Sequence, residues 1–288
     1  MNTFCSDTNN PAPIKSIRSG EKILFLDEIK IMGILNLTPD SFYDGSRYIN
    51  NYQNQIKKMI ADGADIIDIG AMSSKPGAVD ISPDEEIDRL GNVIEWISKE
   101  FPQQWISIDT YRSEVAEIAF QQGADILNDI SAFSIDEQLI SIVSSYKKAY
   151  VLMHMRGNPG NMQNNTVYQN LGCEIYDFFI NKIKILIQNG ISEIILDPGF
   201  GFGKSLEDNY KLLASMHFFN SIHYISLLGL SRKSMIYKTL NLNPSEVLNG
   251  TTALHGISFY QNPQILRVHD VKEAKEAIKI WNIYKKMT

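Results

Sequence analysis

The sequence predicts an α/β fold, a single (β/α)8 TIM barrel preceded by a short β-hairpin. The chain has 288 residues, which suits one domain, because barrels of this class use roughly 250 residues. Short apolar, β-branched segments alternate along it with longer segments whose apolar residues recur at helical spacing. This alternation is typical of βα units around a parallel sheet.

Eight apolar segments are the expected barrel strands. In chain order they are 31–35, 66–69, 105–108, 126–128, 149–153, 194–196, 224–228 and 265–268. The earlier run at 23–26 is expected to form the hairpin and to plug the bottom of the barrel. A helix start is marked by Ser82 and Pro83, after which apolar residues recur from Ile87 to Ile97. We expect a flexible segment at 1–20 and the barrel domain at 21–288.

Composition argues against several other classes of protein. The formal charge is -6 with basic and acidic residues interspersed, so nucleic acid is not an expected partner. No segment resembles a secretory signal or offers the roughly 20 apolar residues that cross a bilayer. Cys5 and Cys173 lack disulfide or metal-site spacing, and His217, His223 and His255 lack zinc-ligand spacing. A cytoplasmic location is the resulting expectation.

Polar or ionisable residues stand where the predicted strands end. They are Asn36, Ser73 and Ser74, Asp109, Asn128 and Asp129, His154, Asp197, Ser231, Arg232 and Lys233, and Arg267 with His269. Any one of them has an ordinary explanation, since strand ends often carry helix caps and solvated turns. Because the carboxyl ends of barrel strands meet at one rim, the whole set favours an active site there.

Eight segments that carry these residues resemble the motifs of the dihydropteroate synthase family. They are 32–45, 68–77, 107–110, 123–131, 152–157, 196–204, 229–234 and 266–270. The resemblance implies an enzyme of folate biosynthesis that condenses 6-hydroxymethyl-7,8-dihydropterin pyrophosphate with para-aminobenzoate, giving 7,8-dihydropteroate and pyrophosphate. It also implies Mg²⁺ as cofactor, a homodimer and a target of sulfonamides.

The resemblance assigns several residues to the pterin. A pterin presents an edge of amino and imino donors, which carboxylates and an amide can bind while buried. The implied ring-binding residues are Asp109, Asn128, Asp197, Lys233 and the apolar Met153 and Phe202. Their alternative roles are ordinary ones: a turn carboxylate before Pro198, a solvated lysine, and barrel core for the apolar pair.

Departure of pyrophosphate requires cations near the rim, and Arg267 and His269 are the candidates. They are two residues apart on the last strand and therefore share one side of its pleat. By the resemblance, Asn36 binds magnesium, for which an amide oxygen is a suitable hard ligand; its alternative role is a turn residue. Asp109, Asp197 and Lys233 count with this pair as candidate catalytic residues.

The second substrate is expected near two loops that follow the first two strands. The resemblance places Pro39, Asp40, Phe42, Ser74 and Pro76 there, with Asp40 as a candidate catalytic residue that stabilises developing positive charge. A closing loop of this kind excludes water from a reactive intermediate. At the expected start of a helix, Ser234 would meet the substrate carboxylate.

The second loop departs from the family pattern. The family has Glu-Ser-Thr-Arg-Pro-Gly where this chain has Met-Ser-Ser-Lys-Pro-Gly at 72–77. Lys75 keeps the positive charge but loses the planar fork of arginine, which leaves loop ordering and substrate affinity open.

Two further functions stay open at this stage. A methyltetrahydrofolate–corrinoid methyltransferase would share the ring-binding residues but would not need Asn36, Lys233, Arg267 and His269 in these motifs. A non-catalytic pterin-binding paralogue is motivated by the altered second loop alone. The glycine-rich stretch 199–204 is not a phosphate loop, because Pro198 stands where glycine is required. Its glycines are expected to permit close approach of the backbone to a ligand.

Overall fold

The computed structural model describes residues 16–37, 48–72, 81–157, 160, 162 and 166–287. Eight parallel strands close into a barrel in the order β10-β3-β4-β5-β6-β7-β8-β9. They are β3 (Lys30–Asn36), β4 (Ile66–Gly70), β5 (Trp105–Asp109), β6 (Ile126–Asp129), β7 (Ala149–Met153), β8 (Ile194–Asp197), β9 (Ile225–Leu228) and β10 (Ile265–Val268). The predicted fold class is confirmed, and each predicted strand matches an observed one.

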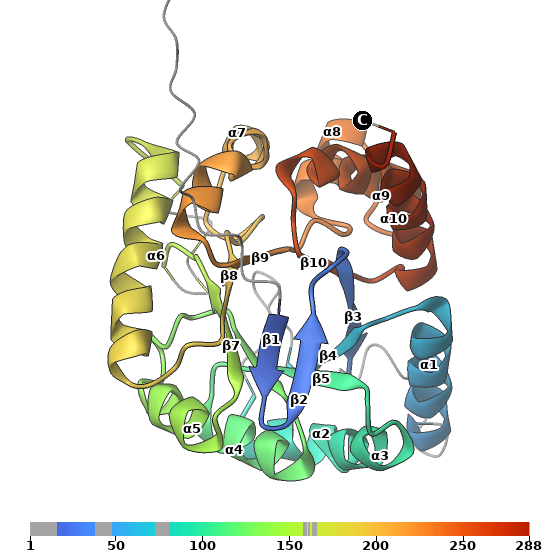
Figure 1. Cartoon of the computed structure of the whole chain (residues 1–288), viewed down its shortest axis with the longest axis vertical. Coiled ribbons are helices and arrows are strands. Elements are labelled where there is room, and N and C mark those ends of the chain that lie inside the picture. Colours follow the sequence, from blue (N-terminus) through green and yellow to red (C-terminus); the bar gives the residue numbers. More distant parts are fainter. Residues whose placement is uncertain are drawn as a thin grey trace, which may run out of the picture.

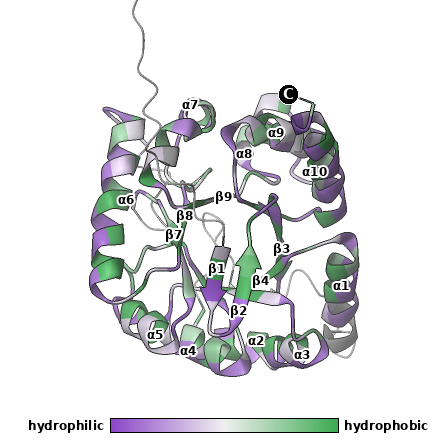
Figure 2. Ribbon diagram, viewed as in Figure 1, coloured by the Kyte–Doolittle hydropathy of each residue, from purple (hydrophilic) through white to green (hydrophobic). Residues whose placement is uncertain are grey.

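Helices surround the barrel and complete the βα units (Figure 1). They are α1 (Tyr48–Asp62), α2 (Pro83–Leu90), α3 (Val93–Glu100), α4 (Ser113–Gln122), α5 (Gln138–Tyr146), α6 (Leu171–Gln188), α7 (Leu206–Ala214), α8 (Ser234–Leu240), α9 (Leu248–Ser258) and α10 (Val271–Lys285), with short 3-10 helices η3 (Met216–Ile222) and η4 (Phe259–Gln261). Figure 2 shows that these helices carry both polar and apolar residues, as helices between a core and solvent do. Among the described residues, none of the helices has the length and apolar character needed to span a membrane.

The predicted helical pattern after Ser82 divides into two helices. The Ser82 side chain accepts a hydrogen bond from the Glu85 amide at 3.2 Å and caps α2, as its position before Pro83 suggested. At the other end, Gly91 adopts φ 50° and ends α2, so that α3 begins at Val93. The apolar spacing continues through the break between α2 and α3. The sequence therefore predicted one continuous helical pattern.

An antiparallel hairpin of β1 (Ser16–Ser19) and β2 (Lys22–Phe25) lies across one end of the barrel (Figure 1). Ile17 and Leu26 are buried in one cluster with Met32, Ile66, Trp105, Ile126, Ala149, Val151, Ile195, Ile225, Leu227 and Ile265. The hairpin therefore plugs the bottom of the barrel, as expected. β1 lies inside the segment 1–20, which we expected to be flexible. Burial of Ile17 fixes β1 to the barrel.

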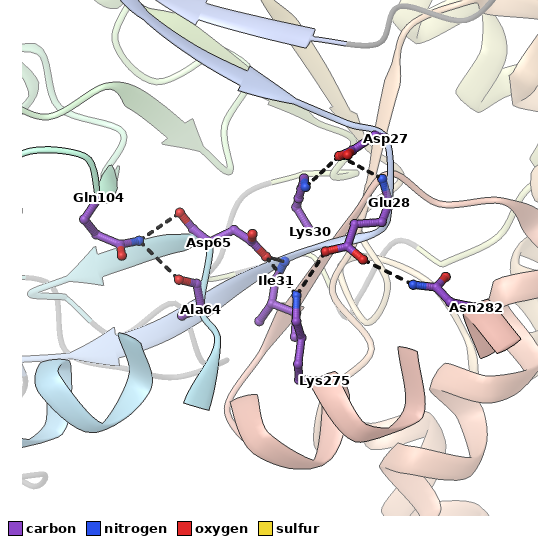
Figure 3. A network of polar contacts seen from close by, with 9 residues as sticks. All are labelled: Asp27, Glu28, Lys30, Ile31, Ala64, Asp65, Gln104, Lys275 and Asn282. Atoms are coloured by element: carbon purple, nitrogen blue, oxygen red, sulfur yellow. Dashed lines mark hydrogen bonds and ion pairs between the residues drawn. The ribbon is translucent and has the colours of Figure 1, made fainter. Parts of the chain in front are cut away.

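Polar contacts join the first and last barrel units at the same end (Figure 3). Lys275 of α10 donates to Glu28 at 3.3 Å and lies 4.0 Å from the Asp65 carboxylate. Asp65 accepts a hydrogen bond from the Ile31 amide at 2.8 Å, and its carbonyl accepts another from Gln104 at 2.8 Å. These contacts tie α10 to the beginnings of β3, β4 and β5 and hold the closed end of the barrel in register.

His255 of α9 makes folding stability depend on pH. Its side chain is 2% exposed, and its Nε2 atom has no hydrogen-bond partner among the described residues. Burial lowers the pKa of His255 to about 4 from the ordinary value of 6.5. Below pH 6.5, His255 therefore binds a proton in the unfolded chain but not in the folded chain. The free energy of unfolding decreases as the pH falls toward 4.

The expected loss through His255 is roughly 3 kcal/mol, since one pKa unit corresponds to about 1.4 kcal/mol. Urea unfolding of the wild type and of His255→Leu at several pH values between 7 and 4 measures it. The variant should lose less stability over this interval. Equal slopes in the two proteins would show that His255 does not contribute.

Candidate active site

Interior side chains change from apolar to polar along the barrel strands. Successive interior residues are two apart, so Ile66, Asp68 and Gly70 of β4 share one side of the pleat. On β5, Asp109 pairs in register with Asn128 of β6, which sets their side chains next to each other. In the same way, β7 and β8 pair Met153 with Asp197. The polar end of the interior is the end opposite to the hairpin plug.

A pocket opens at this polar end. It is lined by Asn128, Ile130, Met153, Asp197, Phe200, Phe202, Gly229, Lys233 and Arg267. Six of these residues were expected from the sequence to bind the ring or the anion. They come from five different strands or strand ends and are Asn128, Met153, Asp197, Phe202, Lys233 and Arg267. The combination of a few polar groups with Met153, Ile130 and two phenylalanines suits a flat, polar-edged ring.

Arg267 is held between two carboxylates beside this pocket. Its Nε atom donates to Asp68 at 2.6 Å, and its Nη2 atom donates to Asp109 at 2.5 Å. Asn128 also donates to Asp68, at 3.1 Å. Burial, opposed by the cation of Arg267 and reinforced by Asp68, raises the pKa of Asp109 to about 7. The arginine expected at the anion site also lines the pocket.

Asp197 and Lys233 also line the pocket. The Asp197 Oδ1 atom accepts a hydrogen bond from the Gly199 amide at 2.8 Å, and burial raises the pKa of this carboxyl group. The Lys233 ammonium lies 4.2 Å from the centre of the Phe202 ring. Burial, followed by repulsion from Arg267, lowers the pKa of Lys233 to about 8. Asp197 is buried and Lys233 is partly buried, which strengthens their interaction with any polar group bound in the pocket.

The glycine-rich stretch after β8 packs closely against the end of β7. Gly199 has φ +70°, and a Cβ atom there would lie 2.0 Å from the His154 carbonyl oxygen. The buried Lys204 donates to the carbonyls of Gly199 and Phe202 at 2.9 and 3.1 Å, which fixes the loop that carries Phe202. The close approach at Gly199 is thus to the protein backbone. The sequence had suggested an approach to the ligand.

His269 lies at the exposed rim, outside the pocket lining. Its Nδ1 atom is 3.0 Å from the Ser231 hydroxyl, which orients the ring. Restricted hydration of the ring nitrogens, together with repulsion from Arg267 and Arg232, lowers the pKa of His269 to about 4. Arg232 itself forms a two-bond ion pair with Asp270, at 2.7 and 3.0 Å. Ser234 is the first residue of α8.

Two residues at strand ends have structural roles. Asp129 accepts hydrogen bonds from the Ser131 and Phe133 amides and from the Tyr150 hydroxyl, at 2.6 to 2.7 Å. His154 is buried against Phe178, with ring centroids 4.9 Å apart. Each therefore stabilises the turn after its strand, which is the ordinary explanation for a polar strand end.

Asn36 ends β3 at the exposed rim, on the same side as Asp109. A Cβ atom at Gly70 would lie 3.8 Å from the Asn36 Oδ1 atom and 3.8 Å from Asp109 Oδ2, so Gly70 leaves space between the two side chains. In the part of the chain that the structure describes, no group of three or more His, Cys, Asp or Glu residues could hold a metal ion.

Six expected site residues lie outside the described residues. They are Pro39, Asp40, Phe42, Ser74, Lys75 and Pro76. Their assignment to the second substrate stays a prediction, as does the effect of the altered second loop.

Sequence reasoning missed Asp68, in addition to the lining residues Ile130, Phe200 and Gly229. Asp68 is fully buried in the middle of β4, between Ile67 and Ile69. A carboxylate within such an apolar strand was the available signal, because an aspartate is almost never fully buried without a partner.

Comparison with known proteins identifies the family. The family described as pterin binding enzyme matches residues 32–269. The chain is 42% identical to a dihydropteroate synthase of Escherichia coli over 262 residues, which cover 89% of this chain and 92% of the relative. The chain belongs to the dihydropteroate synthase family.

Further members of the dihydropteroate synthase family agree in sequence and structure. The enzyme of Bacillus subtilis is 38% identical over 260 residues, covering 89% of this chain and 88% of the relative. The Yersinia pestis dihydropteroate synthase, solved as a sulfonamide drug complex, superposes with a TM-score of 0.89 at 37% identity, covering 94% of this chain and 99% of that one. The Xanthomonas albilineans enzyme, solved with 4-aminobenzoic acid, gives a TM-score of 0.87 at 32% identity, covering 94% and 98%.

Proposed function

We propose that the chain condenses 6-hydroxymethyl-7,8-dihydropterin pyrophosphate with para-aminobenzoate to give 7,8-dihydropteroate and pyrophosphate. The curated relatives are transferases of this activity, and the similarity extends over about nine tenths of both chains. The observation that carries the proposal is the buried pocket in which Asn128, Asp197, Lys233 and Arg267 converge. These groups supply the acceptors and cations that a pterin ring with a charged leaving group requires.

Ring recognition follows from the buried polar groups. Carboxylate and amide oxygens of Asp197 and Asn128 accept hydrogen bonds from the ring amino and imino groups, and Lys233 donates to a ring acceptor. Met153 and Phe202 cover the apolar faces. A ring that fails to pair these buried groups would be rejected strongly, since each unpaired group costs about 1–3 kcal/mol.

The transfer step breaks the bond between the pterin methylene carbon and the pyrophosphate oxygen, and the electron pair leaves with pyrophosphate. The aniline nitrogen of para-aminobenzoate then forms a bond to that carbon and releases a proton. The charge of Asp197 stabilises the positive charge that develops on the ring. Arg267 and His269 would receive the departing anion at the rim.

Mg²⁺ is part of this proposal. The exposed amide oxygen of Asn36 is a hard ligand, and magnesium commonly takes only one or two protein ligands beside substrate oxygens and water. Asn36 would therefore hold the ion, which when bound would neutralise charge on the pyrophosphate. A homodimer, a cytoplasmic location and sensitivity to sulfonamides belong to the same proposal.

A turnover assay tests the function. The chain is incubated with the dihydropterin pyrophosphate, para-aminobenzoate and Mg²⁺, while released pyrophosphate is measured by a coupled assay and the product by mass spectrometry. We expect 7,8-dihydropteroate only when all three are present. Methyl transfer from methyltetrahydrofolate to a corrinoid protein would indicate the methyltransferase instead. Tight pterin binding without turnover would indicate a non-catalytic binding protein.

Arg267→Ala should weaken inorganic pyrophosphate binding about 10- to 100-fold, because a hydrogen bond to a charged group contributes roughly 1.5–3 kcal/mol. Calorimetric titration of wild type and variant measures the change. Arg18→Ala is the matched control, since it removes the same charge from β1 at the opposite end of the barrel. Unchanged pyrophosphate affinity in Arg267→Ala would remove this residue from the anion site.

A further inference from the structure

Asp68 is a buried carboxylate that does not line the pocket but contacts two residues that do. Its Oδ2 atom accepts from Arg267 Nε at 2.6 Å and from Asn128 Nδ2 at 3.1 Å. Its Oδ1 atom is buried and has no hydrogen-bond partner among the described residues. Dehydrating a carboxylate costs free energy, and no hydrogen bond to the Oδ1 atom offsets this cost. Its contacts to Asn128 and Arg267 are therefore the feature that calls for explanation.

The bond to Asn128 fixes which way that amide faces. An asparagine side chain has one donor end and one acceptor end. Because the donor end of Asn128 is directed at Asp68, its carbonyl oxygen is left as the acceptor for groups in the pocket. A ring edge that carries donors fits this orientation, whereas a ring edge of acceptors does not.

The bond to Arg267 fixes a second wall of the pocket. The guanidinium group is planar, and its Nε and Nη2 atoms bind Asp68 and Asp109 at the same time. Two carboxylates from neighbouring strands thereby set the plane of the group. They also neutralise its charge, which lowers its attraction for any further anion.

We propose that Asp68 is a positioning residue, which orients Asn128 and Arg267 for the donor-bearing edge of the ring and competes with pyrophosphate for Arg267. This inference rests on the proposed function. Through the oxygen that accepts two hydrogen bonds, Asp68 is a determinant of ring specificity. Through its negative charge, Asp68 weakens the binding of an anion to Arg267. The two effects have opposite signs and can be measured separately.

Two variants separate the oxygen from the charge. Asp68→Asn can keep an acceptor oxygen toward Asn128 and Arg267 while it loses the charge, and Asp68→Ala loses both. Calorimetry uses 6-hydroxymethylpterin as a ring without an anion, and inorganic pyrophosphate as an anion without a ring. We expect Asp68→Ala to bind the ring at least tenfold more weakly and Asp68→Asn to stay within about threefold of wild type. Both variants should bind pyrophosphate a few-fold more tightly.

Ser107→Ala is the matched control, since Ser107 pairs in register with Asp68 and also has a buried oxygen without a partner among the described residues. It should change neither affinity more than twofold. In an Asn128→Ala background, Asp68→Ala should cost much less ring affinity than it does alone, because it acts largely through Asn128. If Asp68→Ala does not fold, Asp68→Ser takes its place, and the pyrophosphate result for Asp68→Asn is decisive alone.

A parallel loss of ring and pyrophosphate affinity in the Asp68 variants would overturn the inference, because general damage to the pocket weakens both. Unchanged ring affinity in Asp68→Ala would overturn it as well. Neither result affects the proposed function as long as wild type turns over. That function fails separately, if wild type forms no product.

Discussion

Asp197→Asn should lower kcat about 10²- to 10³-fold while the barrel stays folded. This magnitude is that of removing one preorganised electrostatic group from a transition state. Asp197 is buried beside the pocket, with its Oδ1 atom bound to the Gly199 amide. The amide oxygen of asparagine can accept the same hydrogen bond, so the substitution removes chiefly the negative charge opposite the developing pterin cation.

Steady-state kinetics and thermal unfolding of this variant make the test. Asp177→Asn is the matched control, because Asp177 is exposed on α6 and loses the same charge away from the pocket. It should keep wild-type kcat. Wild-type kcat in Asp197→Asn would mean that the charge of Asp197 plays no part in the reaction.

Gly199→Ala should destabilise the fold by more than about 3 kcal/mol and abolish pterin binding. An alanine Cβ would stand 2.0 Å from the His154 carbonyl oxygen, so the backbone of β7 or of the following loop must move. The left-handed φ of +70° adds roughly 1–2 kcal/mol for any residue with a Cβ. The same shift would displace Phe202, which belongs to this stretch, and Asp197, which accepts a hydrogen bond from the Gly199 amide.

Urea unfolding and pterin titration measure the two effects of Gly199→Ala. For Gly256→Ala we expect the opposite effect on stability. Gly256 lies within α9, and a Cβ atom there would meet nothing within 4 Å. Alanine there should stabilise the protein by roughly 0.5–1 kcal/mol. A Gly199→Ala protein as stable as wild type would show that the loop can relax without loss of the fold.

The barrel could be predicted from sequence because its strands are buried on both faces. Each is a short, mostly apolar segment, and each coincides with an observed strand. β1 was missed, since Ser16–Ser19 offers only one buried apolar side chain, Ile17. The break between α2 and α3 was missed as well, because it depends on the conformation of Gly91 and leaves the apolar spacing unchanged.

The site was predictable to the extent that strand ends define it. Asn128, Met153, Asp197, Lys233 and Arg267 meet at one pocket because parallel strands end together. The pairing of Arg267 with Asp68 and Asp109 was not predictable, since these residues are 199 and 158 positions apart in the chain. Only closure of the barrel brings them into contact.

The plug at the bottom of the barrel has a consequence for synthesis of the chain. The hairpin leaves the ribosome before the barrel strands, yet the cluster that buries Ile17 includes Ile265 of β10, the last strand of the barrel in chain order. The packing around Ile17 therefore stays incomplete until β10 has been made. Contacts of such long range form slowly, and an apolar end left open in the meantime invites association with other chains. We expect the nascent protein to depend on early shielding of its first strands more than a helical bundle of equal length would.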